Sequence, residues 1–339
     1  MRKKVGILTF HASHNFGSML QNFALQQVLQ QLGYDCETIN FRSQFQRDYR
    51  SGEWHIPNRH WKTILKKFLL LPYCRAFTIK YRKFEAFLKQ NLICSIQYNC
   101  EEEILKNIPQ YDIYLAGGDQ IWNTKTIDFS WLYFLPFSAK KKISYSPSMG
   151  DRPFLSAENQ TKVKQYLKEF SAISIREESG ARLLETLNIH PTVALDPTLL
   201  LTAEQWKKHI SDKPLIKGDY LFVYAPYSGK ASLLKQIPPH NQLPLVITTV
   251  LTWSILYNPR FIKRFDTGPW DFLNLIYHSK GVVSGSFHAA VFAKLFNKPL
   301  YCMDMGSGSR IANLEEKFKH LEEERNKSMK FLKEALQDE

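Results

Sequence analysis

The sequence predicts an α/β fold with two Rossmann-like domains that face a cleft, and with a C-terminal helix. The chain opens with an apolar strand, a helix and a second strand, which together form a β-α-β unit. Short apolar segments then alternate with helical ones, and a second set of them begins near residue 219. This alternation is typical of a mainly parallel sheet covered by helices on both faces.

The first set of segments defines the N-terminal domain, which we expect to span residues 1–205. "KKVGILTF" is the first strand, "MLQNFALQQVLQQLG" the helix that Gly33 ends, and "DCETIN" the second strand. A basic, helical insertion is expected over 41–100. Later strands are expected in "YDIYLAGGDQIWN", "KKISYSPSMG", "SAISIREESG" and "TVALDPT".

A linker over 206–218 and a C-terminal domain over 219–339 complete the expected organisation. The second domain contains the strands "YLFVYAP", "PLVITTV", "GVVSGSF" and "PLYCM". Its tail repeats apolar residues at helical spacing, which predicts a packing face on a C-terminal helix. The stripe comprises Leu314, Phe318, Leu321, Met329, Leu332 and Leu336.

Composition narrows the class of protein. With 339 residues, 44% of them apolar, the chain is long enough for two domains. No apolar run approaches the roughly 20 residues of a membrane span, and the first one stops at His11, too early for a secretion signal, so we expect a cytoplasmic protein. The five cysteines form no CxxC pair and the ten histidines are scattered, so we expect no disulfide framework, no metal and no cofactor.

The formal charge of +13 is concentrated in residues 41–90, where twelve Lys or Arg face three acidic residues and aromatic residues are interleaved. Such a segment suits nucleic acid, an anionic membrane surface or an acidic glycan. Nucleic acid is not expected, because no nucleic-acid-binding motif accompanies the charge. We expect peripheral contact with the inner face of the membrane; the alternative is an ordinary solvated helical face.

The stretch "GVVSGSFHAAVF" contains the first candidate site. It predicts a strand, a turn of small residues at Ser284, Gly285 and Ser286, and a helix that carries His288 in its first turn. The first N–H groups of a helix lack partners within the helix and favour anions, and small residues let an anion approach them. The alternative is that Ser286 simply caps the helix and His288 is a surface residue.

Other chemistry has weaker support. The phosphate loop, the dinucleotide fingerprint and the nucleophile elbow are all missing. Arg176 and Arg310 offer planar forks of donors for a carboxylate or phosphate, although either could be an ion-pair partner instead. Asp119 and Asp196 are potential bases, but a role in stabilising their own turns is commoner, and we favour it for Asp196.

Five segments together resemble one known family. "LTFHASHNFGSMLQNFALQQVL", "DIYLAGGDQIWN", "SIREESGARLLETL", "ALDPTLLL" and "VVSGSFHAAVFAKLFNKPLYCM" occur in an order and spacing similar to the polysaccharide pyruvyl transferases. The resemblance spans about residues 4–320. It implies a fold like that of the B-type glycosyltransferases and transfer of the pyruvyl group of phosphoenolpyruvate to sugar hydroxyls, usually as a cyclic ketal on a surface glycan.

The resemblance also implies roles for residues. His288 matches the family's histidine at this helix start and is the expected acid/base group. The family often has Arg-Leu-His where this chain has Ser286-Phe287-His288, so the arginine that would grip the donor is absent. We therefore expect the donor to contact Ser284, Gly285, Ser286, Phe287, Arg176 and Arg310.

The acceptor is expected to be a glycan or a lipid-linked oligosaccharide that binds to the first domain. The expected contacts are His11, Asn15, Gly17, Asp119 and Gln120. Two other functions stay open at this point. One is a glycosyltransferase of the same fold that uses a nucleotide sugar, and the other is a non-catalytic glycan-binding protein.

Overall fold

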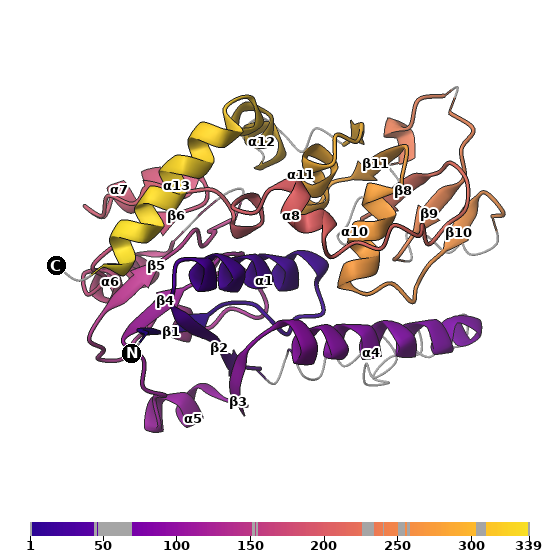
Figure 1. Cartoon of the computed structure of the whole chain (residues 1–339). Helices are drawn as coiled ribbons and strands as arrows, with labels where there is room; N and C mark the ends of the chain where they lie inside the picture. The colour runs from indigo at the N-terminus through magenta and orange to yellow at the C-terminus, as the bar shows by residue number, and fades with distance from the viewer. Residues whose placement is uncertain are drawn as a thin grey trace. The chain divides into compact units, whose positions relative to one another are not determined.

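The computed structural model divides the chain into two compact units, each built around a parallel sheet (Figure 1). It describes residues 2–43, 46, 70–150, 153, 155–225, 234–239, 241–249, 255, 258–302 and 310–337. Unit 1 comprises 1–50, 88–201 and 320–339, and unit 2 comprises 51–87 and 202–319.

Unit 1 contains a five-stranded sheet with the order β3-β2-β1-β4-β5, in which all neighbours are parallel. The first strand lies in the centre and the chain returns to it after β3, which is the order of a Rossmann-like sheet. The strands are β1 (Lys4–Leu8), β2 (Asp35–Phe41), β3 (Cys94–Tyr98), β4 (Ile113–Ala116) and β5 (Lys142–Ser144). A parallel bridge from Ile143 to Ala172 connects β5 to a two-stranded sheet of β6 (Ser174–Ile175) and β7 (Thr192–Val193).

Most helices of unit 1 follow one of its strands. Helix α1 begins after an asparagine cap, and its chain turns at Gly33, which has a φ of 88° that favours glycine. The helices are α1 (Phe16–Gln31), α5 (Glu101–Lys106), α6 (Ala157–Leu167), α7 (Glu178–Glu185) and α13 (Leu321–Leu336), with short 3-10 turns η2 (Trp131–Phe134) and η3 (Pro197–Leu199). Helix α4 (Cys74–Asn91) continues from unit 2 into unit 1 at Leu88.

Unit 2 repeats the topology of unit 1, with the parallel order β10-β9-β8-β11-β12. Its strands are β8 (Leu221–Tyr224), β9 (Leu245–Ile247), β10 (Phe261–Lys263), β11 (Gly281–Ser284) and β12 (Leu300–Tyr301). Its helices are α8 (Ala203–Lys207), α10 (Pro269–Tyr277), α11 (Phe287–Leu295) and α12 (Arg310–Lys319), with short turns η1 (Leu71–Tyr73) and η4 (Leu234–Gln236). Both sheets therefore have the strand order expected of two Rossmann-like domains.

The division into units differs from the expected domain boundaries at the linker, in the insertion and at the C-terminal helix. Residues 203–207, which overlap the start of the expected linker over 206–218, form helix α8. Fully buried Trp206 packs edge-on against Phe292 with ring centroids 5.0 Å apart. In addition, residues 51–87 of the expected insertion group with unit 2. The boundary at Leu201 and Thr202 thus lies just before the expected linker.

The C-terminal helix α13 belongs to unit 1, whereas we expected it to accompany the second domain. Its Ser328 hydroxyl accepts a hydrogen bond from the Leu195 amide at 2.9 Å, and the Arg325 Nε donates to the Leu199 carbonyl at 2.8 Å. Leu332 and Leu336 are fully buried, as the apolar stripe predicts. The stripe identified a packing face, but only these contacts show where that face packs.

The described part of the basic segment 41–90 buries some of its apolar residues, whereas Leu71 and Tyr81 are exposed. Leu70 and Phe77 belong to the hydrophobic core of unit 2, and Phe84 and Phe87 are also buried. The Lys83 Nζ pairs with the Asp271 carboxylate of α10 at 2.6 Å. Residues 44, 45 and 47–69, which are half of the expected membrane contact over 41–90, lie outside the described residues. Among the residues that are described, no helix combines the length and apolar character needed to cross a membrane.

We predict that Ser328→Ala destabilises the protein by about 1–3 kcal/mol, because the buried Leu195 N–H loses its acceptor. Alanine's better helix propensity recovers only about 0.5 kcal/mol, so the net effect stays destabilising. Urea unfolding followed by circular dichroism measures it. Lys330→Ala, on an exposed position of the same helix, should stay within about 0.5 kcal/mol of the parent. Equal stability of the two variants would contradict the docking of α13 described above.

Candidate functional site

The carboxyl ends of the unit 1 strands form the first candidate site. In open parallel sheets, ligands bind beyond these ends. Among the described residues, three other than glycine have left-handed backbone there or in the turns that follow: His14 after β1 (φ 46°), Asp119 after β4 (φ 68°) and Ser146 after β5 (φ 54°). Such conformations cost of order 1–3 kcal/mol each and concentrate at functional sites.

His11 and Asn15 come from the loop between β1 and α1. The His11 ring is buried, with Nδ1 3.1 Å from the Thr9 carbonyl oxygen and Nε2 2.9 Å from the Asn40 Oδ1. The Asn15 Oδ1 accepts hydrogen bonds from the Gly17 and Ser18 amides at 2.9 and 3.3 Å, and so caps α1. Both side chains therefore hold the loop together; their expected contacts with the acceptor stay predictions.

Asp119 and Gln120 follow β4. The Asp119 Oδ1 accepts a hydrogen bond from the Gln120 amide at 2.8 Å, and its Oδ2 accepts one from the Ser18 hydroxyl. Asp119 is buried, whereas Gln120 is partly exposed and its Oε1 accepts from the Asn123 amide group at 2.9 Å. Asp119 thus ties the start of α1 to the end of β4, and Gln120 lies nearer to solvent.

Arg176 lies at the centre of a buried ionic network. Its Nε donates to the Glu177 Oε1 at 3.1 Å and its Nη1 donates to the Asp196 Oδ2 at 2.9 Å. All three side chains are at most 5% exposed. Burial by itself lowers the pKa of the Arg176 guanidinium, but Glu177, Asp196 and Asp119 outweigh it and hold that pKa above its usual range.

The network is supported by further hydrogen bonds. The Thr198 amide and hydroxyl both donate to the Asp196 Oδ1, at 3.0 and 2.7 Å, which confirms the expected turn role of Asp196. The Ser148 hydroxyl donates to the Glu177 Oε1. This arrangement favours the alternative in which Arg176 is an ion-pair partner, while its role as a donor clamp stays a prediction.

Sequence reasoning missed one member of this network, Ser148, and considered Glu177 only as an adjacent acid with which Arg176 could form an ion pair. Both lie just after predicted strands, at the same sheet edge as Asp119. A polar residue at that place was the available signal. Nothing in the sequence distinguished Glu177 from the neighbouring Glu178, which is exposed.

The turn after β11 forms the second candidate site, in unit 2. Ser284 donates its hydroxyl to the Tyr224 carbonyl at 2.6 Å and accepts the Ser286 amide at 3.0 Å, which fixes the turn. Ser286 is the N-terminal cap residue of α11 but makes no side-chain capping bond. Among the residues that the structure describes, a Cβ added to Gly285 would meet nothing within 4 Å, so these residues leave open space beside the turn.

His288 lies in the first turn of α11, where the sequence predicted it. The side chain is 8% exposed, and the ring of Phe287 contacts it edge-on with centroids 5.3 Å apart. Neither the Ser286 hydroxyl nor an acidic side chain of the first turn caps the N-terminus of α11, since the Ser286 side chain makes no capping bond and the turn contains no acid. This is the setting in which a helix N-terminus attracts an anion.

Two further expectations from the sequence concern Arg310 and the absence of a metal site. Arg310 is the first residue of α12, and its side chain is not among those described. Within the described ranges, no group of three or more His, Cys, Asp or Glu could hold a metal ion.

Solved structures similar to this chain show its fold. The UDP-GlcNAc 2-epimerase of Methanocaldococcus jannaschii is 13% identical, with a TM-score of 0.51, and the match covers 95% of this chain and 92% of that one. A putative UDP-N-acetylglucosamine 2-epimerase of Listeria monocytogenes is 11% identical, with a TM-score of 0.53 and coverage of 97% and 91%. S. aureus MnaA with UDP is 13% identical, with a TM-score of 0.51 and coverage of 96% and 91%. The expected α/β fold, like that of the B-type glycosyltransferases, is confirmed.

Comparison at the level of sequence identifies the family. No curated protein sequence matches the chain. The family model described as polysaccharide pyruvyl transferase, however, matches residues 15–307. This range includes the Arg176 network, the turn at Ser284 to His288 and every strand of both five-stranded sheets other than β1. Because the match covers most of the chain, the protein belongs to the polysaccharide pyruvyl transferase family.

Proposed function

We propose that the protein transfers the pyruvyl group of phosphoenolpyruvate to two hydroxyls of a sugar in a surface polysaccharide or its precursor, forming a cyclic ketal and releasing phosphate. The turn from Ser284 to His288 carries this proposal. It places a histidine in the first turn of a helix, beside the open space at Gly285, where backbone amides attract an anion. Phosphoenolpyruvate has two anionic groups, a carboxylate and a phosphate.

The reaction balances without a cofactor. The methylene carbon of phosphoenolpyruvate gains a proton, and the first sugar hydroxyl forms a bond to the neighbouring carbon and loses its proton. The carbon–oxygen bond to phosphate then breaks, and the second hydroxyl closes the ring as its proton goes to the departing phosphate. Histidine suits these transfers because its ordinary pKa is near neutrality.

The residues that bind the donor must differ from the family's pattern, because Ser286 occupies the place of the family's arginine. Arg176 and Arg310 are the forks proposed to replace it. The proposed acceptor contacts are His11, Asn15, Gly17, Asp119 and Gln120 in unit 1. We further propose that a lipid-linked acceptor reaches the enzyme where residues 41–90 touch an anionic membrane surface.

A phosphate-release assay with phosphoenolpyruvate and candidate glycans tests the proposal. A thermal-shift experiment without a glycan is a second test, in which the rise in melting temperature caused by phosphoenolpyruvate is compared with that caused by UDP. A ligand at 100 times its dissociation constant stabilises by about 2.7 kcal/mol. Stabilisation by UDP alone would favour a nucleotide-sugar glycosyltransferase, and stabilisation by neither would favour a non-catalytic glycan-binding protein.

We predict that His288→Ala lowers turnover by at least about 10²-fold and leaves the fold intact, because it removes the proton-transferring group. The phosphate-release rate at saturating donor measures the effect, and circular dichroism checks the fold. His190→Ala, at an exposed position of unit 1, is the matched control and should keep full turnover. Near-normal turnover in His288→Ala would remove this histidine from the mechanism.

We predict that Asn15→Ala and Asp119→Ala raise the Michaelis constant for the acceptor and leave that for phosphoenolpyruvate unchanged. Both also remove local hydrogen bonds, and loss of the Asn15 cap alone costs about 1 kcal/mol of stability. Kinetics are therefore measured well below each variant's melting temperature. A drop in melting temperature with unchanged acceptor kinetics would show that Asn15 and Asp119 stabilise their turns and do not bind the acceptor.

We predict that Lys in place of the true clamp arginine weakens phosphoenolpyruvate binding, because one ammonium cannot reproduce two parallel hydrogen bonds. Arg176→Lys and Arg310→Lys are compared by calorimetric titration. Arg176→Lys also disturbs two buried carboxylates, so its melting temperature should fall whether or not it binds the donor. Normal affinity in both variants would place the clamp on other residues.

A further inference from the structure

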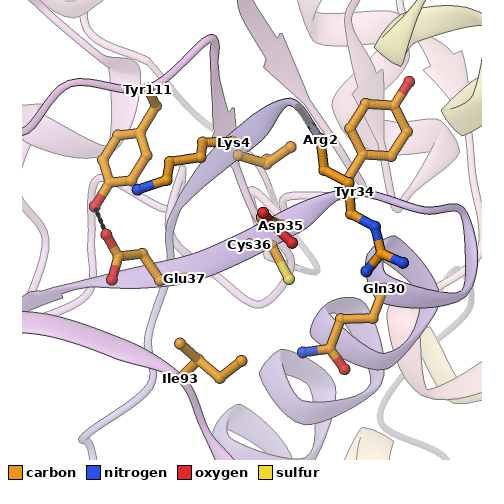
Figure 2. Close-up of a pocket in the computed structure, with 10 residues that line it drawn as sticks. Arg2, Lys4, Gln30, Tyr34, Asp35, Cys36, Glu37, Ile93 and Tyr111 are labelled. Atoms are coloured by element: carbon orange, nitrogen blue, oxygen red, sulfur yellow. Dashed lines mark hydrogen bonds between the residues drawn. The ribbon is translucent and has the colours of Figure 1, made fainter.

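A second hollow lies at the opposite edge of the unit 1 sheet from the candidate site. Lys4 and Asp35 are the first residues of the paired strands β1 and β2 and are neighbours in register. They line a cavity of about 510 Å³, within the usual range for small-molecule sites (Figure 2). Because this is the amino edge of parallel strands, the reaction proposed above makes no use of it.

Charges of both signs line this cavity without neutralising one another. Arg2 and Lys4 contribute two cations, and Asp35 and Glu37 contribute two carboxylates. Among the described residues, none of these four groups forms an ion pair within 4.0 Å. Figure 2 shows the side chains of Lys4 and Arg2 extending to opposite sides of Asp35. Opposite charges therefore face one space and are too far apart to satisfy each other.

The walls of the cavity are held in place by contacts outside it. The Tyr111 hydroxyl donates to the Glu37 Oε1 at 2.7 Å, which orients that carboxylate. The Tyr111 ring lies on Gly6, where an added Cβ would come within 2.3 Å of it. On the other side, the Tyr34 hydroxyl donates to the Leu336 carbonyl of α13 at 3.1 Å. Two aromatic side chains are thus fixed before any ligand enters.

We propose that this cavity binds a small zwitterion, a molecule with one ammonium and one carboxylate group. A simple anion would meet Asp35 and Glu37, and a simple cation would meet Arg2 and Lys4. Only a ligand with both charges can place each one beside its opposite. The site is separate from the proposed donor and acceptor sites, so binding there does not depend on the proposed reaction.

The test uses a series of ω-amino acids of increasing length as probes: glycine, γ-aminobutyrate and ε-aminocaproate. Butyrate, butylamine and glucose are the controls with one charge or none. Saturation-transfer NMR and calorimetry on the full chain measure binding. We expect one length in the series to bind best, and each control to bind at least about fivefold more weakly, since one partly exposed ion pair is worth up to about 1 kcal/mol.

Two exposed-site variants locate the binding. Asp35→Asn and Lys4→Gln should each weaken the best probe about fivefold, and both should fold normally because both side chains are exposed. Asp219→Asn and Lys280→Gln alter an exposed ion pair of unit 2 and should change nothing. The proposal is wrong if no ω-amino acid binds below about 10 mM, if glucose or butyrate binds equally well, or if Asp35→Asn and Lys4→Gln bind like the parent. Each of these outcomes leaves the pyruvyl transfer proposal unaffected.

Discussion

Parallel strand pairing is the constraint on which both units depend. Two parallel neighbours cannot be joined by a tight turn, so each strand is followed by a crossover that returns the chain to the same starting edge. The carboxyl ends of β1, β4, β5 and β6 consequently lie at one edge of unit 1, and those of β8, β9 and β11 lie at one edge of unit 2. The candidate residues share an edge for this topological reason, although they are far apart in the chain.

At the carboxyl edge of the unit 1 sheet, this arrangement of strand ends brings several charged side chains close together. Arg176 forms hydrogen bonds with Glu177 and Asp196, and the charge of Asp119 also acts on it. Buried ions are expensive, and removing one member of such a network typically costs 3–5 kcal/mol, because its partners are left buried and unpaired. The network holds the ends of β4, β5, β6 and β7 in one arrangement. A site built on it is therefore rigid before substrate arrives, which is what positioning of reacting groups requires.

The edge of unit 2 is arranged differently. The Ser284 hydroxyl donates to the Tyr224 carbonyl and accepts from the Ser286 amide. Among the described residues, Gly285 leaves space in front of the first turn of α11. The two edges thus differ in character: one presents an interlocked set of ionic side chains, and the other presents backbone amides and a histidine. This difference fits the proposed assignment of hydroxyl-bearing acceptor to unit 1 and anionic donor to unit 2, since backbone amides favour an anion whereas carboxylates oppose one.

The sequence by itself determined the fold class, the strand–turn–helix around His288 and the turn at Asp196, because apolar periodicity and small turn residues are local signals. Only the tertiary structure decided where α13 packs and what surrounds Arg176. The apolar stripe of α13 specifies a buried face but not its partner, and Ser328 meets Leu195 across 133 positions. Likewise, nothing local distinguishes Glu177 from Glu178; one is buried beside Ser148 and the other is exposed, because the chain brings the ends of β5 and β6 together. Long-range pairing chooses among side chains that look equivalent in sequence.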